Sequence, residues 1–380
     1  MKIVIAPDSF KESLTASEVC DAIETGFTTV FKEADIIKIP MADGGEGTAA
    51  ALKETLSGQW QSIIAHDPLM RPIEASYVLL PNQTAIIEMA SCAGLHLLTQ
   101  SERDPSIATT YGVGEMLLDA IDKGAKHIIL GIGGSATNDA GTGMLKALGY
   151  RFLDSQHHEL AQGGKALAAL AFIDSSGVSD KIADISITVA CDVTNPLCGK
   201  LGASHVYAPQ KGATLDDIVI LDNALSHFAN IASRQNFSDN RNEAGAGAAG
   251  GLGFALMTFL SATLTGGFQL VSEFSNLEQM IQQADLVITG EGKMDFQTSM
   301  GKVASGVLSL AKAVNVPVIA ICGVVDDPHR HWKDDGFTIA IPSIQTLSSL
   351  DEALALAKQN VEKTAYNIAM AMQLGQQLNR

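Results

Sequence analysis

The sequence predicts an α/β fold in which helices cover both faces of a mainly parallel sheet. Short apolar runs rich in β-branched residues recur along the chain, with the length and composition of buried parallel strands. Six such runs occupy residues 3–6, 36–39, 127–130, 185–190, 285–289 and 316–321. Helical patterns lie between many of them, beginning with the capping box Thr15-Ala-Ser-Glu18. Strands that alternate with helices favour a parallel sheet buried on both faces.

The composition predicts a folded, acidic protein with two domains. The chain has 380 residues, more than one hydrophobic core usually spans, and 46% of them are apolar, which argues against disorder. Its formal net charge of −17 makes nucleic acids and anionic membranes poor partners. The five cysteines are scattered without a CxxC pair, and no signal peptide is present, so we expect a cytoplasmic protein without disulfides or structural zinc.

One segment imitates a membrane span. Residues 244–272 carry no charge and are long enough to cross a bilayer. However, the segment holds seven glycines, which a stable helix disfavours. We therefore expect a glycine-rich loop followed by a short buried helix over residues 254–264, and no membrane partner.

The domain order is predicted to be discontinuous. The apolar runs 77–80 and 84–89 are separated by a Pro-Asn-Gln turn and predict an antiparallel hairpin, unlike the strands around them. The runs after residue 285 resemble the opening strands again. We therefore assign residues 1–66 and 286–380 to a first domain and residues 67–285 to a second.

Chemistry is expected at the carboxyl ends of the strands, where ligands bind in open α/β sheets. Five strands end in loops that combine an acidic residue with glycine, serine or threonine. The first loop carries Asp8, Ser9 and Lys11, and a hydroxyl, an ammonium group and the following helix N-terminus could together hold a carboxylate or a phosphate. The alternative is a plain turn with a helix cap.

The second loop contains Asp43, Gly44, Gly45 and Glu46. Its glycines let backbone amides approach an anion, while its carboxylates are suited to magnesium or a substrate hydroxyl. A glycine-rich turn without a function is the alternative.

The third loop, at residues 131–143, is the densest in glycine. Its residues 131–136 fit GxGxxA, and Asp154 lies 23 residues beyond Gly131, which imitates a dinucleotide fingerprint. An NAD(P)-dependent hydroxy-acid dehydrogenase that uses Gly131–Ala136 is therefore the main alternative function.

A dinucleotide-binding helix would begin at once, but Asn138, Gly141 and Gly143 would weaken its first turns. A long loop that presents the hydroxyls of Ser135 and Thr137 is better suited to a phosphate tail or a small polar substrate. It is also no Walker A loop, because no Gly-Lys-Ser/Thr closes it.

The fourth loop places Asp192 at the end of a buried strand, where a carboxylate can act as general base or magnesium ligand. Cys191 beside it is interpreted as a packing residue rather than a nucleophile. Downstream, Lys211 lies in a turn and is expected to reach phosphates. The fifth loop carries Lys293 and Asp295 among hydroxyl residues, a combination suited to phosphoryl transfer, with a surface loop as the alternative.

Taken together, these loops resemble one family. The segments APDSFKESLTA, ADGGEGT, GIGGSATNDAGTGML, CDVTNPLCG, GAGAAGGLGFAL and TGEGKMDFQTSMGK occur in the order expected of bacterial glycerate kinases of the glyoxylate and glucarate/galactarate pathways. The resemblance covers essentially the whole chain. One departure is Lys293, where the family often has arginine, and this loses forked hydrogen bonding.

The resemblance implies two α/β domains, one of them Rossmann-like, with the active site in the cleft between them. It also implies phosphorylation of D-glycerate by ATP with Mg²⁺, generally to 2-phosphoglycerate rather than 3-phosphoglycerate. A homo-oligomer is compatible with it. A non-catalytic protein that binds a small ligand is a further alternative, although the acidic residues at the strand ends are all present.

Phosphoryl transfer requires positioning and charge neutralisation more than covalent chemistry, which suggests roles for the loops. We expect ATP at Gly133, Gly134, Ser135, Thr137, Lys211, Gly250 and Gly251. We expect glycerate at Asp8, Ser9, Asp43, Gly44, Gly45 and Glu46, with Asp43 and Glu46 as the magnesium ligands. Asp192 is the expected general base, with Asp295 as the second candidate, while Lys11 and Lys293 neutralise charge. Four carboxylates, those of Asp8, Asp43, Asp192 and Asp295, compete for these roles.

Overall fold

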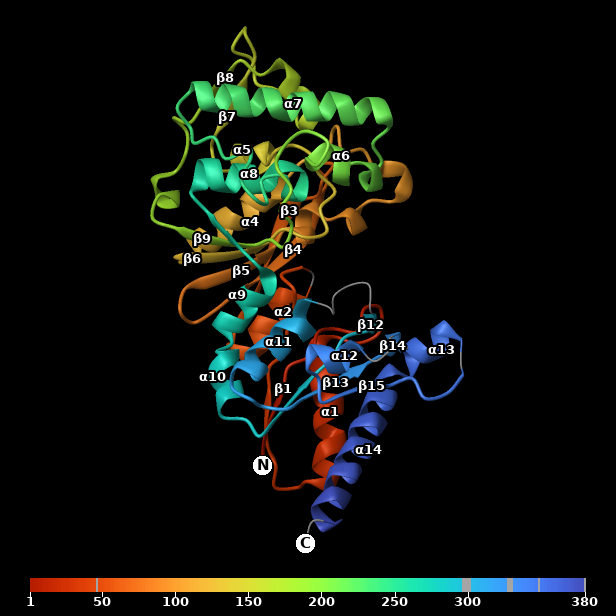
Figure 1. Cartoon of the computed structure of the whole chain (residues 1–380). Coiled ribbons are helices and arrows are strands. Elements are labelled where there is room, and N and C mark those ends of the chain that lie inside the picture. Colours follow the sequence, from red (N-terminus) through yellow and green to blue (C-terminus); the bar gives the residue numbers. More distant parts are fainter. Residues whose placement is uncertain (46, 296–301, 327–330, 348, 379–380) are drawn as a thin grey trace. The chain divides into compact units, whose positions relative to one another are not determined.

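The computed structural model describes residues 1–45, 47–295, 302–326, 331–347 and 349–378. It has a mixed α/β fold with parallel strands in both of its large sheets (Figure 1). The chain forms two compact units. Unit 1 comprises Met1–Asp43, Ala50–Leu56 and Phe268–Arg380, and unit 2 comprises Gly44–Ala49 and Ser57–Gly267.

Unit 1 is built on a five-stranded sheet in which every strand pair is parallel, in the order β15-β13-β11-β1-β2. The strands are β1 (Lys2–Ile5), β2 (Asp35–Lys38), β11 (Leu286–Thr289), β13 (Val318–Cys322) and β15 (Ile339–Pro342). Four of them were predicted from apolar runs, and these predictions are confirmed. Strand β15 was missed because it is only partly buried and therefore carries a weaker apolar signal.

The chain order of these strands creates a switch point at the centre of the sheet. From β1 the chain crosses to β2 on one side, whereas β11, β13 and β15 extend the sheet on the other side of β1. The loops that follow β1 and β11 therefore leave neighbouring strands in opposite directions. In open α/β sheets, this is where ligands bind.

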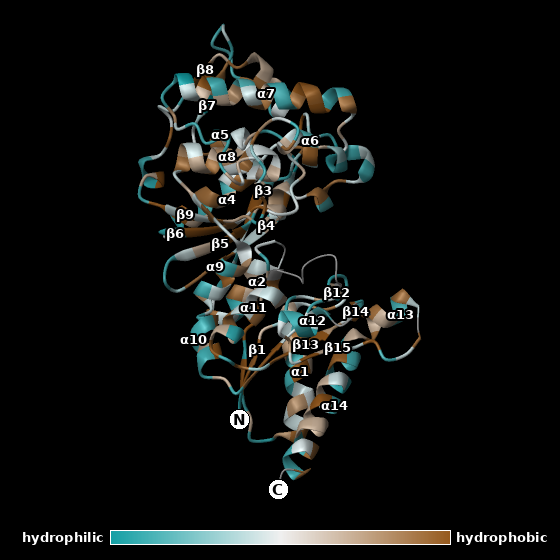
Figure 2. Cartoon of the chain, in the orientation of Figure 1, coloured by the Kyte–Doolittle hydropathy of each residue, from teal (hydrophilic) through white to brown (hydrophobic). Residues whose placement is uncertain are grey.

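Two long helices of unit 1 pack against each other. Helix α1 (Ala16–Val30) begins at the predicted Thr15–Glu18 capping box and buries Val19, Ile23 and Phe27 completely. Helix α14 (Ala357–Leu378) packs so closely on it that a Cβ at Gly26 would lie 2.5 Å from the Glu362 carbonyl oxygen. Strand β1 beneath them is brown in the hydropathy colouring of Figure 2, as expected for a strand buried on both faces.

The remaining elements in which unit 1 residues lie are short. The helices are α2 (Thr48–Thr55), α9 (Gly267–Phe274), α10 (Leu277–Gln282), α11 (Lys302–Ala313), α12 (His331–Asp335) and α13 (Leu350–Ala355). Strands β12 (Lys293–Asp295) and β14 (Val324–Asp326) pair in parallel beyond the ends of β11 and β13. They therefore add a second, smaller sheet at the carboxyl edge of the main one.

Unit 2 contains a six-stranded mixed sheet in the order β10-β9-β6-β5-β4-β3. Its strands are β3 (Gln59–His66), β4 (Pro72–Leu79), β5 (Thr84–Glu88), β6 (His127–Gly131), β9 (Ser186–Ala190) and β10 (Thr263–Thr265). The predicted hairpin is confirmed as the antiparallel pair β4–β5, and β5, β6, β9 and β10 run parallel.

Strand β3 belongs to the sheet of unit 2, whereas its residues were assigned to the first domain from the sequence. Residues up to 66 were assigned to the first domain, but β3 pairs with β4 along its whole length, from Gln59 opposite Leu79 to His66 opposite Pro72. The strand was missed because it is an edge strand with many polar residues and offers no continuous apolar run. The division into domains at residue 66 and residue 285 otherwise stays a prediction.

The helices of unit 2 surround a separate core. They are α3 (Ala90–Ala93), α4 (Tyr111–Asp122), α5 (Thr142–Ala147), α6 (Ala203–Tyr207), α7 (Leu215–Arg234) and α8 (Ala248–Leu260), with 3-10 turns η1 (Leu95–Leu97), η2 (Gln100–Glu102), η3 (Gly164–Ala169), η4 (Asp180–Ile182) and η5 (Pro209–Lys211), and the hairpin β7 (Arg151–Leu153)–β8 (Phe172–Asp174). Phe228 on α7 makes ring contacts with Phe152, Phe254 and Phe259.

The uncharged segment 244–272 contains the predicted glycine-rich turn and buried helix, but helix α8 ends before residues 263–264, which were predicted to be helical and lie in strand β10. Its glycines lead into α8, whose residues Ala249, Gly250 and Gly251 have left-handed backbone angles before the regular helix starts. The helix that follows is largely buried. Among the described residues, no helix is long and apolar enough to cross a membrane.

Candidate functional site

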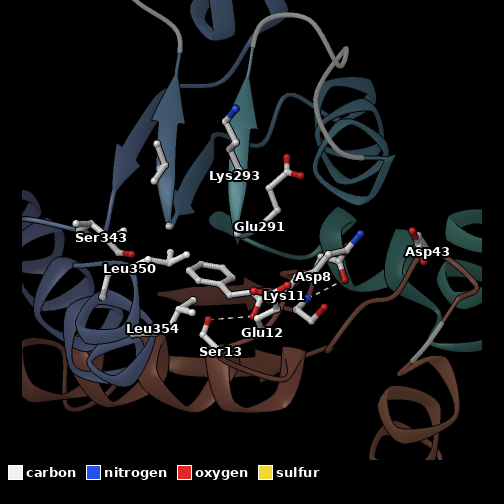
Figure 3. A pocket seen from close by; sticks show the side chains of 18 residues that line it. Asp8, Lys11, Glu12, Ser13, Asp43, Glu291, Lys293, Ser343, Leu350 and Leu354 are labelled. Carbon is white, nitrogen blue, oxygen red and sulfur yellow. Dashed lines mark hydrogen bonds between the residues drawn. The ribbon is translucent and has the colours of Figure 1, made fainter. Parts of the chain in front are cut away.

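Unit 1 contains a cavity of about 480 Å³ at the carboxyl edge of its sheet (Figure 3). Its walls come from the loops after β1, β11, β13 and β15 and from α13 and the start of α14. Its ionisable lining residues are Asp8, Lys11, Glu12, Asp43, Glu291 and Lys293. The first and fifth candidate loops, more than 280 residues apart in the chain, therefore meet at one place.

Asp8 occupies the switch point between β1 and β11. Its backbone N–H donates to the Gly290 carbonyl oxygen at 2.9 Å, which joins the two loops, and its Oδ1 accepts the Ser9 N–H at 2.7 Å. Burial raises the pKa of the Asp8 carboxyl to about 6, and the nearby Asp43 charge adds to this, while Lys11 and the bond from Ser9 oppose it. A carboxyl with a perturbed pKa in a cavity is a functional candidate.

The cavity also holds two cationic side chains. Lys11 follows Asp8 in the same loop, and Lys293 begins β12, where its Nζ lies 3.5 Å from Asp326 Oδ2. The Lys293 side chain keeps 56% of its surface exposed. Asp295, two residues on, has its backbone paired opposite Asp326 in β14.

The predicted magnesium ligands are only partly described. Asp43 lines the cavity, whereas Glu46 lies outside the described residues, as do residues 296–301 of the fifth loop. Within the described part of the chain, no group of three or more histidine, cysteine, aspartate or glutamate residues is placed to hold a metal ion.

Unit 2 brings together the second, third and fourth loops. A Cβ at Gly44 would lie 2.6 Å from the Ala190 Cβ at the end of β9, and one at Gly131 would lie 2.9 Å from the Gly44 carbonyl oxygen. A Cβ at Gly133 would lie 3.3 Å from the Gly45 Cα. The backbone of these loops is therefore packed at the carboxyl ends of β6 and β9, which only glycine permits at Gly44, where φ is +86°.

The glycine-rich loop after β6 does not lead into a dinucleotide-binding helix. Helix α5 starts only at Thr142 and ends at Ala147, as the glycine and asparagine content of the loop predicted. Gly133 and Gly134 are exposed, so a ligand can reach their amides. Ser135 and Thr137, by contrast, are buried.

Lys211 is buried with these residues and bonds to both of them. Its side chain is only 1% exposed, and its Nζ donates to Ser135 Oγ and to the Thr137 carbonyl oxygen, both at 2.7 Å. Burial lowers the pKa of the Lys211 ammonium to about 7, while the Asp139 charge opposes the shift. The sequence predicted that Lys211 reaches phosphates, but the structure directs its amine into the protein, where it holds the loop.

Asp139 is a residue that sequence reasoning missed. It is fully buried, and its Oδ2 accepts hydrogen bonds from the Thr110 N–H and hydroxyl at 2.9 Å and from the Gly143 N–H at 3.1 Å. Burial raises the pKa of this carboxyl, and the same bonds oppose the shift. The available signal was an aspartate just before a glycine-rich helix start, the pattern of a cap.

Gly250 and Gly251 pack against the same loop. Their φ angles are +69° and +91°, and a Cβ at Gly250 would lie 2.1 Å from the Thr137 carbonyl oxygen. Both are buried. Close packing and left-handed backbone account for these glycines, which the sequence assigned to the nucleotide.

Asp192 is exposed, unlike Ser135, Thr137 and Lys211. It follows β9, its side chain is exposed, and its Oδ1 accepts the Gly267 N–H at 3.1 Å, at the first residue of α9. A carboxylate at a helix N-terminus is stabilised by the helix dipole. Glu88, at the end of β5, accepts the Ala49 N–H near the start of α2 in the same way, and sequence reasoning missed it.

Known proteins similar to this chain share one description. Residues 3–373 match the model of the glycerate kinase family. The chain is 46% identical to a glycerate kinase of Bacillus subtilis (strain 168), over 98% of both proteins, and 45% identical to a glycerate 2-kinase of Escherichia coli (strain K12), over 99% of both. A crystal structure from Salmonella typhimurium LT2, of a protein assigned to the glycerate kinases, covers 99% of both chains with a TM-score of 0.91 at 46% identity.

Proposed function

We propose, from the premise that this chain belongs to the glycerate kinase family, that it transfers the terminal phosphate of ATP to D-glycerate and forms 2-phosphoglycerate. ATP is the phosphate donor that a kinase family implies, and the Escherichia coli relative is named a glycerate 2-kinase. The observation that carries the proposal is the unit 1 cavity, which gathers carboxylates and ammonium groups at a topological switch point.

The residues of this cavity suit substrate and charge. Lys11 and Lys293 would neutralise the glycerate carboxylate and the moving phosphoryl group, which is the main requirement of phosphoryl transfer. Asp8, with its pKa of about 6, is largely ionised at neutral pH and could accept a hydrogen bond from a glycerate hydroxyl, with Ser9 beside it. These roles favour a polar, anionic substrate.

We propose Asp192 as the general base and keep Asp295 as the second candidate. The Asp192 carboxylate is exposed at a strand end, and the Gly267 N–H fixes the direction of one of its oxygens. An exposed, oriented carboxylate can take the proton of a substrate hydroxyl.

The oxygen ligands in the unit 1 cavity fit magnesium. Mg²⁺ in kinases is usually held by one or two carboxylates together with phosphates and water, so a large all-protein cluster is unnecessary. Asp43 and Asp8 line the same cavity, and the Asp43 charge contributes to the raised pKa of Asp8. Asp43, with Glu46, would hold the ion, whose charge would neutralise the phosphates.

In the predicted nucleotide set, Gly133 and Gly134 keep amides that an anion can reach. Lys211 donates to the Ser135 hydroxyl and to the Thr137 carbonyl oxygen, so we propose that Lys211 acts by holding this loop in place. We also propose a cytoplasmic location, since all five cysteines are free thiols.

A coupled assay tests the proposed reaction. Purified protein would receive Mg-ATP and D-glycerate, and the product would be passed to enolase with and without phosphoglycerate mutase. Immediate signal without the mutase identifies 2-phosphoglycerate, and a signal that requires the mutase identifies 3-phosphoglycerate. L-glycerate is the stereochemical control. Absence of ADP formation with D-glycerate would refute the proposal.

A further inference from the structure

We propose that the unit 1 cavity is the nucleotide site of this protein and that its apolar end holds the adenine base. This inference rests on the proposed ATP-dependent reaction and adds where the nucleotide binds. It moves the nucleotide away from the unit 2 residues to which ATP was assigned from the sequence.

The position of the cavity in the sheet is the first argument. It lies at the carboxyl ends of the paired strands β1 and β11, and it is lined by Asp8 from the loop after β1 and by Glu291 from the loop after β11. The Gly323 N–H and the Val324 N–H donate to the carbonyl oxygens of Glu291 and Gly292 at 3.1 Å, so the walls of the cavity are tied together by backbone bonds. A rigid crevice at the switch point of a parallel sheet is the usual place for a nucleotide.

The distribution of polarity is the second argument. In Figure 3, Leu350 and Leu354 lie at one side of the cavity and Asp43 at the other, with Asp8 and Lys11 between them. Phe10, Val324 and Ile344 add apolar side chains to the lining. The site therefore has an apolar end and an ionic end, which suits a ligand with the same division.

Glycerate does not have this division. It carries oxygen on every carbon and has no apolar face, so it gains nothing from a wall of leucine, isoleucine and phenylalanine. The volume of about 480 Å³ falls in the range of cofactor and drug-sized ligands. A purine fits the apolar end, and the phosphates then extend toward Lys11 and Lys293.

The unit 2 residues offer the base no comparable surface. Ser135, Thr137, Lys211, Gly250 and Gly251 are all buried, and the Lys211 amine is bonded to the loop that carries Ser135 and Thr137. Gly133 and Gly134 expose only backbone, which can bind an anion but not a purine face. The apolar wall of unit 1 is thus the feature that a nucleobase requires.

The test uses a substitution that narrows the apolar end of the cavity. It then compares the binding of ligands that carry a nucleobase with the binding of a ligand that lacks one. In Ala353→Phe, on α13, an aromatic ring enters the cavity, whereas Ala355→Phe places the same ring at an exposed position of that helix that does not line it. We expect Ala353→Phe to raise the Kd for ADP and the KM for ATP about tenfold, a change of ~1.4 kcal/mol. The KM for D-glycerate and the Kd for inorganic triphosphate, which lacks a base, should stay within about twofold.

A second variant covers the case that Ala353→Phe does not fold. Leu354→Ala removes part of the apolar wall and should weaken ADP binding about threefold or more, while Ala355→Phe binds as the wild type. Unchanged ADP binding in both cavity variants, or a rise confined to the KM for glycerate, would overturn the inference. ADP binding that depends on Ala353 in a protein without glycerate turnover would instead refute the proposed reaction and leave the nucleotide site intact.

Discussion

Both units gather polar residues at the carboxyl ends of parallel strands, but they use them differently. In unit 1, Asp8, Lys11 and Lys293 face an open cavity. In unit 2, the Ser135 hydroxyl of the glycine-rich loop is buried and bonded to the buried Lys211 amine, and the buried Thr137 hydroxyl has no hydrogen-bond partner among the described residues. A polar loop at a strand end can therefore either line a cavity or be buried in the protein. The sequence does not reveal which of the two applies.

Asp192 is the unit 2 residue for which we propose a catalytic role, so it tests whether the polar residues of unit 2 are structural only. If it is the general base, Asp192→Asn should lower kcat by two or more orders of magnitude, with little change in the free energy of unfolding. Asp184→Asn is the matched control, because Asp184 is exposed just before the other end of β9 and should leave kcat unchanged. Near wild-type turnover in Asp192→Asn would remove it from this role and would leave unit 2 with a structural part only.

Gly250 tests whether the unit 2 glycines serve packing. Gly250→Ala should lower the free energy of unfolding by about 2–4 kcal/mol, because φ is +69° and a Cβ would lie 2.1 Å from the Thr137 carbonyl oxygen. Gly375→Ala, where no atom lies within 4 Å, should raise it by about 0.5–1 kcal/mol. Urea unfolding measures both. A Gly250→Ala protein of normal stability that loses only ATP affinity would favour the nucleotide role instead.

Asp8 provides a test of the open cavity by pH. Its folded-state pKa is raised from 3.8 to about 6, so the folded state binds the extra proton and stability falls as pH rises from about 4 to about 6. In metal-free protein, the wild type should lose on the order of 1–3 kcal/mol over this interval relative to Asp8→Asn. Glu12→Gln, an exposed residue of the same cavity, is the control. Parallel pH profiles for wild type and Asp8→Asn would contradict the buried state of Asp8.

Much of the fold followed from the sequence because buried parallel strands carry a strong local signal. The runs at β1, β6 and β11 are continuous and apolar, and they were placed correctly. Strands β3 and β15 were missed because an edge strand or a partly buried strand mixes polar and apolar residues. Their pairing depends on distant partners, which no local pattern contains.

The candidate site was predictable where polar residues follow strands. Asp8, Lys11 and Lys293 were chosen by that rule, and the structure places them around one cavity. The apolar part of the cavity lining was not predicted, because Leu350 and Leu354 lie in a short helix whose sequence resembles that of an ordinary surface helix. Burial was equally invisible in sequence, which is why Lys211 was expected to face a ligand.

Lys211 gives the smallest expected effect near neutral pH and the opposite pH dependence from Asp8. Its pKa is lowered from 10.5 to about 7, so the unfolded state binds the extra proton between these values and stability rises with pH above about 7. Lys211→Met leaves Ser135 Oγ and the Thr137 carbonyl without this donor, at a cost of about 1–2 kcal/mol near neutral pH that grows toward about pH 10. Lys200→Met, at an exposed position, should show neither effect. If Lys211→Met unfolds as the wild type at every pH but loses ATP binding, the lysine reaches the nucleotide after all, and the contrast between the two units fails.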